Sequence, residues 1–150
     1  MNGGAHTDPR IVVGVDGSEP SKRALRWAAD QAKLIGAQLK AVTTWEYPPT
    51  LGWAPPYPSD FDPDEDARKA LQETVDAVLG GDPGLVVQLT VTEGHPAFVL
   101  TQEARDAELL VVGSRGHGAF AGMLLGSVSE YCAAHSPCPV VVVRHPDDKS

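Results

Sequence analysis

Two glycine- and serine-rich segments that lie close together in the sequence have the composition of a phosphate-binding site. Gly113-Ser114-Arg115-Gly116-His117-Gly118 follows an apolar run, and Gly126-Ser127-Val128-Ser129 opens the next amphipathic segment. Glycines let a backbone approach a phosphate closely and present several N–H groups as a concave nest. A helix start adds unpaired N–H groups and the positive end of the helix dipole, and Ser127 and Ser129 can add hydroxyl donors. These residues therefore suit the binding of a phosphate-containing anion.

The same segments also fit a flexible loop that ends in a serine-capped helix, because glycine-rich turns often follow strands. They lack the G-K-[ST] ending of a Walker loop, and their glycine spacing departs from the G-x-G-x-x-G fingerprint. Arg115 and His117 lie within the loop, where each either contacts the anion or stays solvated. Asp16, just after the apolar run 11–15, likewise has two interpretations: a ligand contact, or an Asx turn ahead of a helix.

Apolar runs alternate with amphipathic segments along the chain. Apolar and β-branched runs predict strands at 11–15, 39–45, 85–92, 109–112 and 139–144. Helical spacing of apolar residues predicts helices at 21–35, from 63 to the glycines at 80–81, from 96 to 104, and at 127–135. About five strands alternating with about four helices predict a doubly wound α/β domain, with a five-stranded parallel sheet and helices on both faces.

Several residues mark where the helices begin and end. Ser18 or Glu19 lies at the expected N-cap of the first helix, with Pro20 in its first turn and Gly36 as its stop. Asp62 caps the second helix, which starts at Pro63. The inward face of the first helix is predicted to consist of Ala24, Leu25, Ala28, Ala32 and Ile35.

In doubly wound sheets, ligands bind beyond the carboxyl ends of the strands at the point where the strand order reverses. The loops after the strands are therefore the candidate site. One of them, 46–62, is long and rich in proline. Its aromatic residues, together with the one that precedes it, either stack a base or pack the loop: Trp45, Tyr47, Trp53 and Tyr57. We expect residues 10–145 to form one domain, with tails at 1–9 and 146–150.

The spacing Gly113-x2-Gly116-x9-Gly126-Ser127 resembles the nucleotide-binding signature of the universal stress protein family. The opening IVVGVDGS, with Asp16 at the end of its strand, and the closing SPCPVVVVR are similar to that family as well. The resemblance covers residues 10–144. It implies a Rossmann-like fold of the adenine nucleotide alpha hydrolase type, with ATP or a related adenine nucleotide in the crevice between the first and fourth strands.

By matching position, the resemblance implies that Asp16 contacts the ribose, Gly17 the edge of the adenosine, and Val42 the adenine ring. It also implies a set of residues at or near the ribose and phosphates: Gly113, Gly116, Gly126, Ser127, Val128 and Ser129. One departure is Lys40-Ala41, where many relatives carry a histidine before the residue equivalent to Val42. Any Mg²⁺ is expected to bind through the nucleotide's phosphates.

The predicted fifth strand contains an unbroken valine run, Val140-Val141-Val142-Val143. If this strand ends the sheet, it forms an apolar edge that would aggregate unless it is paired or covered. The resemblance implies that two copies of this strand pair antiparallel. We therefore expect a homodimer through residues Val140 to Val143.

Composition limits the functions that the chain can have. Twelve Lys and Arg against twenty Asp and Glu give a formal charge of −8, which argues against binding to nucleic acid or to an anionic membrane. We find no 18-residue apolar run and no signal-peptide pattern in the sequence. Its two cysteines are too few for a disulfide framework, so we expect a reduced, cytoplasmic setting. Cys132, His135 and Cys138 have no evident fourth ligand, so no site in which the protein alone holds a metal is predicted.

Three functions from different classes remain open. The first is a dimeric regulatory module of the stress response that binds ATP or another adenine nucleotide. The second is a slow ATPase of the same fold, although no catalytic residue is evident. The third is a dimeric interaction protein that binds no nucleotide. The intact pattern from Gly113 to Ser127 favours the first over the third, and whether the protein is an enzyme stays undecided.

Overall fold

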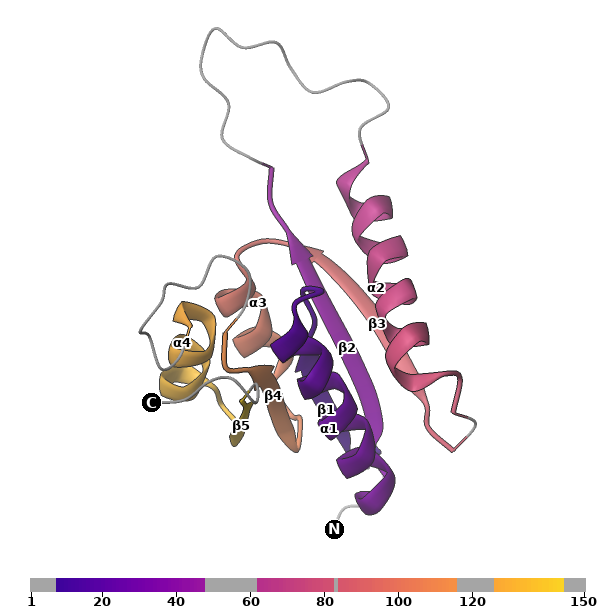
Figure 1. Cartoon of the computed structure of the whole chain (residues 1–150). Coiled ribbons are helices and arrows are strands. Elements are labelled where there is room, and N and C mark those ends of the chain that lie inside the picture. Colours follow the sequence, from indigo (N-terminus) through magenta and orange to yellow (C-terminus); the bar gives the residue numbers. More distant parts are fainter. Residues whose placement is uncertain (1–7, 48–61, 83, 116–125, 145–150) are drawn as a thin grey trace, which may run out of the picture.

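A computed structural model describes residues 8–47, 62–82, 84–115 and 126–144. Figure 1 shows a single sheet with helices packed on both faces. The strands are all parallel and lie in the order β3-β2-β1-β4-β5. In chain order the elements are β1 (Arg10–Gly14), α1 (Glu19–Ile35), β2 (Gln38–Trp45), α2 (Pro63–Leu79), β3 (Val87–Glu93), α3 (Pro96–Glu103), β4 (Leu109–Gly113), α4 (Ser127–His135) and β5 (Val140–Val143). The predicted doubly wound α/β fold is confirmed.

The alternating direction of side chains along a strand divides the core into two layers. Ile11 and Val13 of β1 face α1 and α2, whereas Val12, between them, faces α3 and α4. All three side chains are fully buried. Because both faces of the sheet are covered, its central strands are apolar throughout, as is typical of parallel sheets.

The helix boundaries follow from local capping chemistry. The Ser18 side chain caps α1 by accepting a hydrogen bond from the Ser21 N–H, and Pro20 lies in the first turn. Gly36, with φ of 69°, ends the helix in the left-handed conformation that glycine adopts readily. Asp62 caps α2 and accepts a hydrogen bond from the Glu65 N–H at 3.1 Å. These caps were predictable because each depends on residues within one turn.

The structure also corrects the predicted boundaries and burial. The first helix starts at Glu19, two residues earlier than predicted, because Ser18 is its cap. The third strand starts at Val87, two residues later than predicted. Ile35 was predicted on the buried face but is 43% exposed, because it is the last helical residue before Gly36.

The carboxyl end of β4 packs unusually closely against the start of α1. A Cβ atom added at Gly113 would lie 2.7 Å from the backbone carbon of Pro20 and 2.8 Å from its Cβ. Real Cβ atoms do not approach other heavy atoms this closely. Glycine at 113 therefore lets the first turn of α1 lie directly on the end of β4.

We predict that Gly113→Ala lowers the free energy of unfolding by about 1–3 kcal/mol, because the added methyl must displace the backbone of Pro20. Urea unfolding followed by circular dichroism measures the change. Gly84→Ala is the matched control, since its added Cβ would meet no atom closer than 3.4 Å. Equal stability of the two variants would show that the contact between Gly113 and Pro20 relaxes without cost.

Candidate functional site

The strand order reverses between β1, the central strand of the sheet, and its neighbour β4. From β1 the chain continues to β2 and β3 on one side, and β4 leads to β5 on the other. Their register, from Ile11–Leu109 to Val13–Val111, sets the two carboxyl ends side by side. The chain then leaves β1 for α1 on one face and β4 for α4 on the opposite face (Figure 1). This is the kind of position where doubly wound proteins bind ligands.

A short network of hydrogen bonds shapes the loop after β1. The Asp16 Oδ1 atom accepts hydrogen bonds from the Ser18 N–H at 2.9 Å and the Ser18 hydroxyl at 2.5 Å. The Ser21 hydroxyl accepts one from the Asp16 N–H at 3.2 Å and donates to the Ser18 carbonyl at 3.0 Å. Gly17 has φ of 83°, which favours glycine. The Asx turn predicted as one role of Asp16 is therefore present, with the Asp16 side chain exposed at the edge of the candidate site.

A second network joins the end of β4 to the start of α4. The Ser114 carbonyl accepts hydrogen bonds from the Gly126 N–H at 2.7 Å and the Ser129 hydroxyl at 3.0 Å. The Ser129 hydroxyl also lies 3.0 Å from the Gly126 carbonyl. Ser114 is fully buried and Ser129 is 2% exposed. The hydroxyl of Ser129, expected as a donor to an anion, is thus directed to backbone carbonyls instead.

The start of α4 differs from the other helix starts. Ser18, Asp62 and His95 cap α1, α2 and α3 through side-chain atoms. Gly126 caps α4, and within the described part of the chain no side chain makes a capping hydrogen bond there. The N–H groups of Ser127 and Val128, in the first turn of α4, therefore have no side-chain acceptor among the described residues. Ser127 is exposed and Val128 partly so.

Of the remaining residues predicted to bind the nucleotide, some lie at the candidate site and one is buried in the core. Gly113 and Arg115 lie at the carboxyl end of β4, in line with the site. Val42, predicted to contact adenine, is 1% exposed, and its side chain packs in the core layer beneath α3 and α4. Its carbonyl accepts a hydrogen bond from the Val15 N–H at 2.9 Å. Gly116 and His117 lie outside the described residues.

Two other sequence features receive local explanations. The Trp45 and Tyr47 rings meet edge to face with centroids 5.1 Å apart, and the Trp45 Nε1–H donates to Asp64 at 3.2 Å. These two aromatics therefore pack the exit of β2 against α2, whereas Trp53 and Tyr57 lie outside the described residues. Lys40 forms a partly buried ion pair with Glu103 that links β2 to α3.

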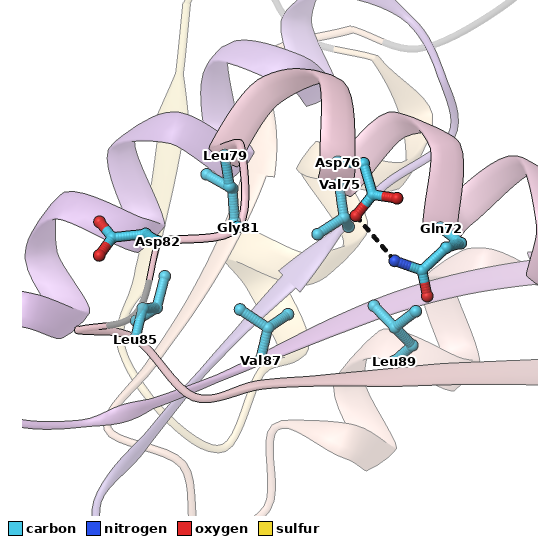
Figure 2. Close-up of a pocket in the computed structure, with 9 residues that line it drawn as sticks. All are labelled: Gln72, Val75, Asp76, Leu79, Gly81, Asp82, Leu85, Val87 and Leu89. Carbon is cyan, nitrogen blue, oxygen red and sulfur yellow. Dashed lines mark hydrogen bonds between the residues drawn. The ribbon is translucent and has the colours of Figure 1, made fainter.

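A separate cavity of about 310 Å³ lies between the last turns of α2 and the amino-terminal half of β3. Figure 2 shows side chains of Val75 and Leu79 from α2 facing Val87 and Leu89 from β3. Lys33 pairs with Asp82 at the rim, at 2.6 Å, and this hydrogen bond lowers the pKa of the Asp82 carboxyl. Because Val87 begins its strand, the cavity is at the opposite end of the sheet from the candidate site.

The described residues include no group of three or more His, Cys, Asp or Glu that could hold a metal ion. Within the same part of the chain, no helix is long and apolar enough to cross a membrane.

Comparisons with known proteins agree with this fold. The model of the universal stress protein family matches residues 9–144. A universal stress protein of Mycolicibacterium smegmatis is 38% identical over 135 residues, which cover 89% of this chain and 45% of that protein. One from Mycobacterium tuberculosis is 36% identical over 143 residues, covering 92% and 44%. The crystal structure of a universal stress protein in complex with cAMP matches 93% of this chain and 98% of its own, with 28% identity and a TM-score of 0.68.

A parallel sheet whose strand order reverses between two adjacent strands, with helices on both faces, defines a doubly wound, Rossmann-like protein. Within that class, this chain belongs to the universal stress protein family. It spans about half the length of the curated relatives that it matches.

The two cysteines differ in environment. Cys132 is fully buried in α4, and burial raises the pKa of its thiol to about 11. Cys138 is partly exposed, and both cysteines are free. Because the thiolate is the reactive form, a thiol with a raised pKa stays protonated and unreactive at neutral pH.

We predict that iodoacetamide at pH 8 modifies Cys138 of the folded protein and leaves Cys132 intact, because Cys132 is both inaccessible and protonated. Peptide mass spectrometry over a time course measures each rate. In concentrated urea both cysteines should react. Equal rates in the folded protein would mean that α4 opens readily from the sheet.

Proposed function

We propose that this chain binds ATP or a related adenine nucleotide beyond the carboxyl ends of β1 and β4. The observation that carries the proposal is the start of α4, where Gly126 is the N-cap and no side chain of the described residues caps the first-turn N–H groups. Helix starts of this kind bind phosphate through N–H groups and the helix dipole. The cAMP complex of a family member with 28% identity supports an adenine nucleotide as the ligand.

Electrostatics explains why the donors are backbone groups. The chain carries a formal charge of −8, so it repels an anionic nucleotide at long range. Neutral N–H groups and a helix dipole supply local attraction without changing that overall charge. In the proposed site Ser127 and Val128 provide N–H groups to the phosphates, Asp16 and Gly17 lie on the ribose side, and any Mg²⁺ binds through the phosphates.

The proposed activity is binding that regulates encounters with partners in the stress response. A slow ATPase would require a group that activates water at the terminal phosphate. Asp16 is committed through Oδ1 to the turn that it forms with Ser18, which favours a binding role for the loop.

We predict that Gly126→Asp weakens ATP binding by about tenfold or more, equivalent to ~1.4 kcal/mol or more. The backbone of Gly126, with φ of −75° and ψ of 166°, is in an extended conformation that does not require glycine, and aspartate is a preferred N-cap. Its carboxylate would occupy the N–H groups and repel phosphate. Isothermal titration calorimetry measures the affinity, and circular dichroism checks the fold.

Ala133→Asp is the matched control for the added charge, because residue 133 is exposed on the same helix, far from its start. It should bind ATP about as well as the wild type. Equal affinity of wild type and Gly126→Asp would place the nucleotide elsewhere. A wild type that binds no adenine nucleotide would favour an interaction protein instead.

We further propose a homodimer through β5, which pairs with β4 on one side and ends the sheet. The carbonyls of Pro139 and Val143 accept hydrogen bonds from the N–H groups of Leu110 and Ser114. Along a strand, backbone groups of alternate residues point to the same side. The N–H and C=O of Val142 therefore point away from β4, toward a partner strand.

We predict that Val142→Pro converts the dimer to a monomer while the domain stays folded, because proline removes an outward donor and is tolerated on edge strands. Analytical ultracentrifugation measures the association. Val141→Pro is the contrasting variant: it removes a donor that faces β4 and should destabilise the domain itself. A wild type that sediments as a monomer at micromolar concentration would contradict the proposed dimer.

A further inference from the structure

Ser114 connects the two surfaces to which the proposed function assigns roles. Its N–H donates to the Val143 carbonyl of β5 at 2.9 Å. Its carbonyl accepts from the Gly126 N–H at 2.7 Å and from the Ser129 hydroxyl at 3.0 Å. One peptide segment at the end of β4 thus binds the last residue of the edge strand on one side and the start of α4 on the other.

We call the hydrogen bonds of Ser114 to Val143, Gly126 and Ser129 the Ser114 junction. Because Ser114 and Ser129 are buried, small changes affect the junction. Ser114 is fully buried and Ser129 is 2% exposed, so water does not readily replace a lost hydrogen bond. Hydrogen bonds in such an interior are stronger than at the surface, and successive bonds polarise one another. Movement of the start of α4 therefore changes the geometry at the Ser114 carbonyl, and with it the bond to Val143.

We propose that the Ser129 hydroxyl is a positioning group that couples nucleotide binding at the start of α4 to pairing of β5 between two copies. This inference rests on the proposed function and adds its regulation. Phosphate held by the N–H groups of Ser127 and Val128 fixes the start of α4. The Ser114 junction then fixes the end of β5, so the second ordering step loses less entropy.

The expected sign is positive coupling, in which ATP tightens the dimer. Linkage requires that dimerisation tightens ATP binding in return. The monomeric variant Val142→Pro should therefore bind ATP more weakly than the wild-type dimer does, although Val142 lies on the opposite edge of β5 from Ser114.

The experiment measures the dimer dissociation constant by analytical ultracentrifugation, with and without saturating ATP, in the wild-type chain and in Ser129→Ala. We expect ATP to tighten the wild-type dimer by roughly fivefold or more, the lower end of common coupling factors. In Ser129→Ala this factor should fall to within about twofold of unity. Calorimetry on both proteins reports ATP binding separately.

Ser136→Ala is the matched control. The Ser136 hydroxyl donates to the Cys138 carbonyl at 2.8 Å, at the other end of the same helix. It should keep the wild-type coupling factor, and Ser129→Thr, which retains a hydroxyl, should restore most of it. If Ser129→Ala does not fold, hydrogen exchange of the wild-type Ser114 and Gly126 amides decides, because both must slow when ATP binds.

The possible failures are distinct. A wild type that binds no ATP by calorimetry overturns the proposed function, and the coupling with it. A wild type that binds ATP and dimerises with the same dissociation constant in both conditions overturns only the coupling. Coupling that survives in Ser129→Ala, or that disappears equally in Ser136→Ala, removes the role assigned to the Ser129 hydroxyl.

Discussion

The pairing of β1 with β4 is the constraint on which the candidate site depends. From β1 the chain continues to β2 and β3 on one side of the sheet, and from β4 it continues to β5 on the other side. The helices that follow the two strands, α1 and α4, lie on opposite faces of the sheet. Gly113 strengthens this arrangement by allowing the start of α1 to rest on the end of β4. The position of the candidate site therefore depends mainly on the topology of the sheet and less on individual side chains.

Features that depend on neighbouring residues were predictable from the sequence. Gly36, Gly80 and Pro63 mark helix ends in the structure as they did in the sequence, because caps and stops act within one turn. The sheet and its helices on both faces followed from the alternation of apolar runs. That the first and fourth strands are neighbours was expected only from the family resemblance, because periodicity does not define strand order.

Features that depend on tertiary contacts were not predictable in the same way. Ser129 lies in a motif that suits anion binding, yet its hydroxyl contacts the Ser114 carbonyl, which the fold brings from 15 residues earlier, as well as the local Gly126 carbonyl. The deep burial of Val42 depends on how α3 and α4 cover the sheet. The sequence did not indicate the role of Ser114, because a serine after a strand is typical of an ordinary loop. Its importance comes from the three backbone and side-chain partners that meet there.

Glycine and serine therefore have different structural roles near the end of β4. Glycine at 113 and 126 removes side chains where α1 packs closely and where α4 presents its N–H groups. Serine at 129 supplies a donor to buried carbonyls near Ser114 that solvent does not reach. A buried hydroxyl is unfavourable unless it is hydrogen-bonded, and here both carbonyls lie at 3.0 Å. The same contacts that satisfy this hydroxyl hold the start of α4 in place, where no side chain of the described residues caps the first-turn N–H groups.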